Sequence, residues 1–395
     1  MLNSIRLNSS ILECIKMKPD KNRFLKGVAI FLLLFSVPFV IRYFWAFCLA
    51  PVPFIIPDEL LYPYTSRLFV SGLASGNFSV FKVNAAHPPL SKFITWLFIS
   101  LLGTSGFSDM GAMRIQSCLF SSLTCVLIYA IVASKTKKSI GVLSWALLSL
   151  DPASIIFALA SLDVTSLFFA VLSMYILLRA PSESWRPYLL AGVCLGLAAL
   201  CKYSAYPIIL GTLILILLAE KNHPSLSAKG ILFLTTSSIL VLIAGNPLLW
   251  RPQLLGFSGY SALVEDSSRA LLNSGGAFSV LTPLDWLEPA FKMTSPAHTI
   301  FYLSMFAHAT TVFPLPIFRY SYLPWLFLGS LLLLLRQQER IEGLELRSLS
   351  WISASCLFLW ILAKSQAEVY YSVWLQPPLA IFSTIAIADL WRRRR

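Results

Sequence analysis

Residues 27–47 read GVAIFLLLFSVPFVIRYFWAF, an apolar run long enough to cross the hydrocarbon core of a bilayer, which takes about 20 helical residues. Similar runs recur along the chain. Of its 395 residues, 57% are hydrophobic and only 12% are charged, whereas soluble domains carry about 25% charged residues. A soluble fold could not bury so much apolar surface. The sequence therefore predicts an all-α, polytopic transmembrane protein.

The apolar runs predict about ten membrane spans. They lie near residues 27–47, 112–134, 139–158, 164–179, 188–201, 203–219, 231–249, 320–335, 349–363 and 376–390. Two further apolar stretches, 91–102 and 299–313, are predicted to be interfacial or re-entrant pieces.

The distribution of basic residues predicts how these spans are oriented. If the N-terminus is cytoplasmic and ten spans alternate, the cytoplasmic segments hold 20 of the 31 Lys and Arg residues, as the positive-inside rule requires. Both termini are then cytoplasmic, and two long ordered loops, about 48–111 and 250–298, lie outside. We treat 1–395 as one integral membrane domain, with a catalytic core at 1–250 and C-terminal helices at 299–395.

Two adjacent carboxylates, Asp58 and Glu59, follow the first apolar run directly. Like charges this close, near a membrane, should raise the pKa of one of them, which suits a general base. The alternative is a pair of interfacial acids that are solvated or that bind Arg67. Two more acids, Asp151 and Asp163, are predicted at the same membrane face, where each could also serve as a helix cap.

Basic residues are expected near the same face: Lys92, Arg114, Lys202 and Arg251. Lys202 interrupts a long apolar tract, so its ammonium group must either snorkel to the headgroups or bind an anion such as a lipid phosphate. His87 precedes two prolines, which forbid helix and fix an extended corner. That corner could carry a functional imidazole or be a rigid turn only.

Other chemistries lack their signatures. The sequence has no Gly-rich phosphate loop, no GxSxG and no HExxH motif, and its four histidines and seven cysteines show no metal-ligand or disulfide spacing. The net charge is +13. The basic residues lie in short clusters between apolar runs, which is the pattern that orients membrane helices, so no nucleic-acid partner is predicted. No resident cofactor is predicted, and the need for a divalent cation is left open.

Four motifs resemble, in order, those of the protein O-mannosyltransferases and their lipid-A-modifying relatives, polytopic glycosyltransferases of the GT-C fold. The similar motifs are Asp58-Glu59 with Tyr62, His87-Pro88-Pro89-Leu90-Ser91-Lys92, Asp151-Pro152 with Ser161-Leu162-Asp163, and Lys202-Tyr203-Ser204-Ala205. The resemblance covers about residues 50–210.

The resemblance implies a catalytic mechanism. An inverting transferase would move a hexose, with mannose as the first candidate, from a polyprenyl- or dolichyl-phosphate carrier to a hydroxyl on a protein or glycolipid acceptor. Asp58, beside Glu59, would be the base, and Asp163 would orient the substrate. The donor region would be lined by His87, Lys92 and Lys202, with Tyr203 beside Lys202 in the last motif. Apart from the resemblance, the charge pattern predicts the donor phosphate near Lys202, Arg114 or Arg251.

Two other classes stay open at this point. A transporter or lipid flippase could use the same acids as proton or substrate sites, but the acids cluster at one membrane face rather than at mid-membrane. A catalytically idle membrane scaffold is the third. The oligomeric state is not decided by the sequence.

The predicted orientation can be tested by cysteine labelling in intact cells. Single-cysteine variants at Ser75 and Gly275, in the two predicted outer loops, should react with a membrane-impermeant reagent. A variant at Ser227 should not react, because it lies in a predicted cytoplasmic loop. The reverse pattern would invert the topology.

Overall fold

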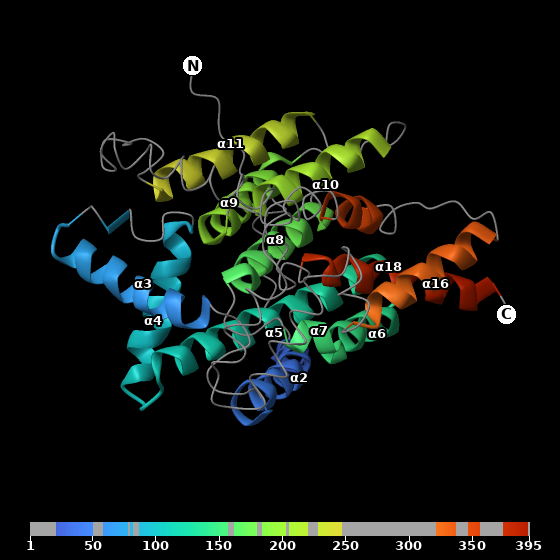
Figure 1. The fold of residues 1–395 in the computed structure, drawn as a ribbon. Coiled ribbons are helices and arrows are strands. Elements are labelled where there is room, and N and C mark those ends of the chain that lie inside the picture. Colours follow the sequence, from blue (N-terminus) through green and yellow to red (C-terminus); the bar gives the residue numbers. More distant parts are fainter. Residues whose placement is uncertain are drawn as a thin grey trace, which may run out of the picture.

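The computed structural model of the protein describes the following residues: 21–49, 58–77, 80–81, 87–156, 162–179, 184–202, 205–219, 228–246, 321–336, 347–355 and 374–393. Within these ranges every regular element is a helix, which confirms the predicted all-α class. Figure 1 shows their arrangement.

The helices have the following bounds: α2 Lys21–Phe44, which continues into the π-helix η1 Trp45–Leu49, α3 Asp58–Ala74, α4 Pro89–Gly103, α5 Asp109–Lys135, α6 Lys138–Leu150, α7 Pro152–Ile156, α8 Leu162–Arg179, α9 Trp185–Cys201, α10 Ala205–Ala219, α11 Ala228–Gly245, α16 Leu323–Arg336 and α18 Gln376–Arg393. Residues 347–355 are also helical.

The protein is an integral membrane protein with several apolar helices. In the described residues, three are long and apolar enough to cross a bilayer: Leu25–Leu49, Asp109–Lys135 and Leu162–Arg179. Five more apolar helices are shorter than that. The count of ten spans therefore remains a prediction, as does the orientation. The stretches 250–298 and 299–313 lie outside the described residues.

The predicted span 139–158 is wrong in one respect, because the helix breaks inside it. Helix α6 ends at Leu150 and α7 begins at Pro152. Asp151 between them has extended backbone (φ −66°, ψ 120°), the conformation favoured before proline. Its carboxylate accepts a hydrogen bond from the Ser154 N–H at 2.9 Å and so caps α7.

Helix α4, predicted as an interfacial piece at 91–102, buries several polar side chains and exposes several large apolar ones. Ser91, Lys92 and Thr95 are buried, whereas Phe93 and Leu101 are 45% and 61% exposed. A helix on the surface of a soluble protein has the opposite pattern. The pattern of α4 fits lipid on its outer face and a polar site on its inner face.

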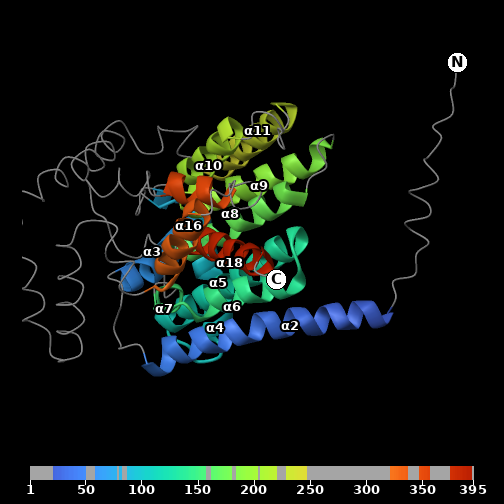
Figure 2. The same ribbon diagram turned by 90° about the vertical axis from the view of Figure 1, so that its right-hand side faces the viewer.

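The helices pack in the order α2, α5, α8, α9 and α11 across the molecule. Both views place α2 along one edge and α11 at the opposite edge, with α8 and α9 between them (Figures 1 and 2). Helices α8 and α9 run antiparallel, since Ser166 donates a hydrogen bond to the Ala198 carbonyl oxygen and Ser173 donates one to that of Ala191. The start of α8 and the end of α9 therefore meet at one end of the bundle.

Helices α9 and α11 approach closely through two glycines. A Cβ at Gly192 would lie 2.3 Å from the Leu234 carbonyl oxygen, and one at Gly196 would lie 2.8 Å from that of Ser238. Ser237 also donates a hydrogen bond to the Leu189 carbonyl oxygen at 3.1 Å. The spacing is the GxxxG pattern by which membrane helices bring their backbones together.

Gly192→Ala should therefore destabilise the protein. Overpacking of this kind costs about 1–3 kcal/mol, and it should lower the thermal midpoint of the detergent-solubilised protein. Gly27→Ala is the matched control, because nothing lies within 4 Å of a Cβ at Gly27 in helix α2. Equal midpoints for the two variants would contradict the close packing of α9 and α11.

Candidate active site

Four predicted site residues, His87, Lys92, Asp163 and Lys202, meet at one end of the bundle because of the helix ends on which they lie, and Arg114 lies near the same end. His87 and Lys92 are at the start of α4, and Asp163 is in the first turn of α8. Arg114 is in the second turn of α5, and Lys202 follows the last residue of α9. These ends belong to neighbouring helices, since α4 packs on α5 and α9, and α8 packs on both of these.

The centre of this cluster is a buried ion pair. The Lys202 Nζ lies 3.0 Å from the Asp163 Oδ2, and the two side chains are only 8% and 1% exposed. The other carboxylate oxygen, Oδ1, accepts a hydrogen bond from the Trp374 indole N–H at 3.1 Å. Lys202 therefore does not snorkel: its ammonium group is buried, and Asp163 supplies an anion.

His87 contacts Tyr62 of α3 next to this ion pair. Their rings meet edge-to-face with centroids 5.0 Å apart, and the Tyr62 hydroxyl lies 3.5 Å from the His87 Nε2. Tyr62 also belongs to a small buried apolar cluster with Met113 and Leu162, the residue before Asp163. The His87 Nδ1 is buried and has no hydrogen-bond partner in the described part of the chain.

The environment of His87 favours the neutral imidazole. Burial lowers its pKa most, and the positive charges of Lys202 and Lys92 lower it further, to about 3. Both ammonium groups therefore act on this ring. A neutral imidazole can donate from one ring nitrogen and accept at the other, so His87 can hold a hydroxyl or phosphate oxygen without adding charge.

Two more of the predicted cations, Lys92 and Arg114, are also buried. Lys92 is 3% exposed, and its Nζ lies 5.4 Å from the centre of the Phe69 ring. Arg114 is 2% exposed, and its Nη1 donates a hydrogen bond to the Ala46 carbonyl oxygen at 2.6 Å. This bond ties α5 to the π-helical end of α2. Buried cations of this kind are costly without compensating anions.

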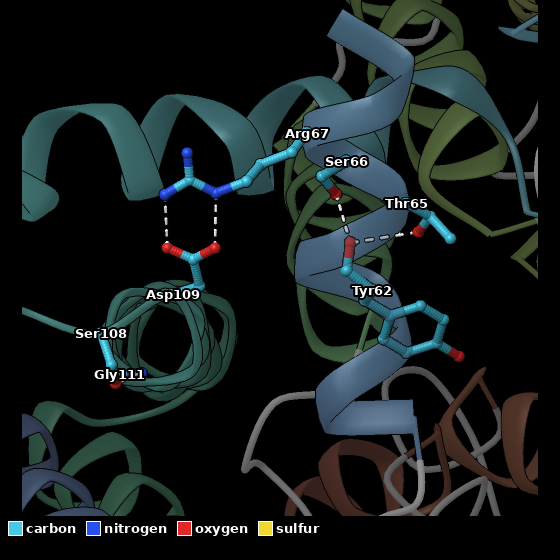
Figure 3. A network of polar contacts seen from close by, with 7 residues as sticks. All are labelled: Tyr62, Thr65, Ser66, Arg67, Ser108, Asp109 and Gly111. Atoms are coloured by element: carbon cyan, nitrogen blue, oxygen red, sulfur yellow. Dashed lines mark hydrogen bonds and ion pairs between the residues drawn. The ribbon is translucent and has the colours of Figure 1, made fainter. Parts of the chain in front are cut away.

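Helix α3 turns one polar and aromatic face inward. Tyr62, Thr65, Ser66 and Phe69 are all buried, at the spacing of one helix face. The Tyr62 carbonyl oxygen accepts hydrogen bonds from the Thr65 and Ser66 hydroxyls at 3.1 and 2.6 Å (Figure 3). Asp58 begins the helix one turn before Tyr62, so the predicted base lies on the backbone turn next to the His87 contact.

An exposed ion pair holds the outer side of α3. The Arg67 Nε and Nη2 donate to the two carboxylate oxygens of Asp109 at 2.5 and 2.6 Å (Figure 3). Asp109 follows Ser108, whose hydroxyl caps α5 by accepting from the Gly111 N–H at 3.1 Å. Arg67 is thus paired with Asp109, and its predicted alternative contact with the Asp58-Glu59 pair stays a prediction, because those side chains lie outside the described parts.

Several predicted residues fall elsewhere. Asp151 is a structural cap, and it also accepts a hydrogen bond from the Ser321 hydroxyl at 2.6 Å. Tyr203, Arg251 and the side chains of Asp58 and Glu59 lie outside the described parts. The sequence analysis missed Trp374 because its partner, Asp163, is 211 residues away in the chain, and no local signal links the two.

A known family matches this part of the chain. The family described as dolichyl-phosphate-mannose-protein mannosyltransferase matches residues 86–250. That range contains His87, Lys92, Asp163 and Lys202, and the predicted resemblance is confirmed over it. No curated protein matches the chain.

Solved structures share the fold, which is of the GT-C type. ArnT from Cupriavidus metallidurans bound to undecaprenyl phosphate superposes with a TM-score of 0.55 at 15% identity, covering 95% of this chain and 62% of ArnT. Its apo form gives 0.54 at 16% identity, covering 93% and 62%. The archaeal oligosaccharyltransferase AglB from Archaeoglobus fulgidus, in complex with an inhibitory peptide and a dolichol-phosphate, gives 0.52 at 11% identity, covering 92% and 50%. The chain thus spans less than two thirds of the length of these proteins.

The neutral state of His87 predicts how stability depends on pH. Its pKa is about 3 in the folded protein, against an ordinary value of 6.5. Below about pH 6.5 the unfolded chain therefore binds one more proton at this residue than the folded chain, and stability falls as the pH falls. When the pH is lowered from about 7.5 to about 5.5, the thermal midpoint of His87→Gln should therefore fall by less than that of the wild type. Equal losses would show that His87 is not held neutral.

Proposed function

We propose that this protein is a membrane glycosyltransferase that takes its sugar from a polyprenyl-phosphate carrier. The observation that supports this most is the buried cluster of Lys92, His87, Lys202 and Asp163 at one end of the helical bundle, within the range of the family match. Positive charge inside a membrane protein marks a site for an anion. The phosphate of a lipid carrier is an anion that reaches such a site from the bilayer.

The proposed reaction is a single displacement. The acceptor hydroxyl oxygen attacks the anomeric carbon of the sugar and gives its proton to Asp58. The bond between that carbon and the phosphate oxygen breaks, and polyprenyl phosphate leaves with inversion at the anomeric carbon. A base is needed on one face of the sugar and a stabilised leaving group on the other.

The cations would stabilise the leaving phosphate. Lys202 is the first candidate, with Arg114 and Arg251 as further ones, because all three were predicted on one membrane face. Removing one contact to a developing charge typically raises a barrier by about 2.7–4 kcal/mol. Asp163 would keep Lys202 in place rather than act as the base, since both of its oxygens are already engaged.

We propose mannose as the sugar, because the family that matches is described as a mannosyltransferase that uses dolichyl phosphate. The structural likeness to ArnT and AglB supports the fold alone at these identities. The acceptor is a hydroxyl on a protein or a glycolipid, and the active site is proposed to face the extracytoplasmic side. The same site in a lipid flippase would move the carrier without breaking the sugar–phosphate bond.

The purified protein in nanodiscs, given radiolabelled polyprenyl-phosphate mannose, should release labelled sugar to an acceptor peptide, a glycolipid or water. Asp58→Asn should reduce this transfer by about 10²–10⁴-fold, since loss of a general base typically costs that much. Asp389→Asn is the matched control, because Asp389 is a partly exposed acid that pairs with Arg392 near the end of α18. Label that crosses the membrane still joined to phosphate would instead indicate a flippase. Retention of more than half of the transfer by Asp58→Asn would exclude it as the base.

A further inference from the structure

The indole of Trp374 completes the buried ion pair from a distant part of the chain. Trp374 precedes α18 and lies outside the matched range 86–250. It is fully buried, and its N–H points at the one oxygen of Asp163 that Lys202 does not contact. The carboxylate is thus held at both oxygens, by an ammonium group on one side and by a neutral donor on the other.

The arrangement limits where the Lys202 ammonium group can lie. A carboxylate with a single partner can rotate about its last bond, whereas one held at both oxygens has a fixed plane. An indole N–H is a donor only, so this contact suits a carboxylate oxygen and fixes the direction in which the other oxygen, Oδ2, faces. That oxygen lies 3.0 Å from the Lys202 Nζ and so holds the ammonium group in place.

A structural role alone does not account for this pattern. Replacing a buried ion pair with well-packed apolar side chains is often neutral or stabilising. Three polar groups from α8, the end of α9 and the segment before α18 are nevertheless brought together in the interior. Within the described residues, a second buried indole has no hydrogen bond. Trp351 is 2% exposed, and its N–H has no acceptor in the described residues.

We propose that Trp374 is a positioning residue that fixes Asp163, and through it the Lys202 ammonium group, in the geometry that binds the phosphate of the lipid donor. Trp374 does not touch the reacting atoms. Its kinetic consequence rests on the function proposed above, whereas its effect on Lys202 does not.

The kinetic test compares Trp374→Phe with Trp351→Phe, which remove the same indole N–H from two buried sites. Loss of a hydrogen bond to a charged group typically weakens binding by about tenfold or more. We expect Trp374→Phe to raise the KM for polyprenyl-phosphate mannose about tenfold and to change kcat much less. Trp351→Phe should stay within about twofold for both. Trp374→His keeps a ring N–H and should recover part of the loss.

The second test needs no turnover. Lysine reactivity toward a small amine-modifying reagent is followed at Lys202 by peptide mass spectrometry, at one pH, in the wild type and in both Phe variants. With Asp163 less well held, the Lys202 amine is less firmly bound to the carboxylate and is more often accessible to the reagent. Labelling of Lys202 should therefore rise several-fold in Trp374→Phe and stay unchanged in Trp351→Phe.

The outcomes separate the two proposals. If the wild type transfers no sugar but Lys202 labelling rises only in Trp374→Phe, the proposed function fails and the positioning role stands. If labelling is unchanged in Trp374→Phe, the positioning role fails, whatever the protein transfers. Equal changes in the two Phe variants, in KM or in labelling, would show that a buried indole matters here only for packing.

Discussion

The burial of one ion pair, between Asp163 and Lys202, constrains how the other described helices can pack. Two charges removed from water are tolerated only when their geometry is good and their remaining hydrogen-bonding capacity is satisfied. The start of α8 and the end of α9 must therefore stay in register at the same end of the bundle. The α9–α11 contact through Gly192 and Gly196 holds the other side of α9. The geometry of the site therefore depends on how the membrane helices pack.

Helix α4 packs against this buried site on the side that faces the lipid. Its exposed large side chains, Phe93, Leu97 and Leu101, are apolar and its Lys92 is buried, so the hydrophobic effect of the bilayer and the charge of the site orient it in the same sense. The result is a positive cluster, of Lys92 and Lys202, that surrounds a neutral His87. Helix α3 closes this cluster through Tyr62, and the exposed Arg67–Asp109 pair ties its far side to α5.

The sequence predicted those parts of the molecule that depend on local pattern. Apolar runs predicted most of the described helices, because burial in lipid is read directly from composition. Helix α3, Asp58–Ala74, was not predicted, because it lacks a continuous apolar run and lies in the stretch 48–111 that was expected to be an outer loop. The end of the bundle at which Asp163, Lys92 and Lys202 meet also followed, because alternating spans and basic clusters assign each charge to a face. The break at Asp151 was missed although Pro152 signalled it, since hydrophobicity continues across it. The partner of Lys202 was not predictable, because a charge in an apolar tract reveals a need for an anion but not which anion meets it.

Two residues of the C-terminal part donate hydrogen bonds to buried acids of the N-terminal part. Asp163 and Asp151 both lie in the matched range 86–250, and each has one carboxylate oxygen bonded from outside it, by Trp374 and by Ser321. Leaving a buried carboxylate oxygen without such a donor costs the protein about 1–3 kcal/mol of stability. A chain ending near residue 250 would lose both donors, at the two places where α8 and α7 begin. The two donors therefore fix the ends of α18 and α16 against the same end of the bundle that carries the site. The matched range supplies the charges, and the C-terminal part holds two of them in position.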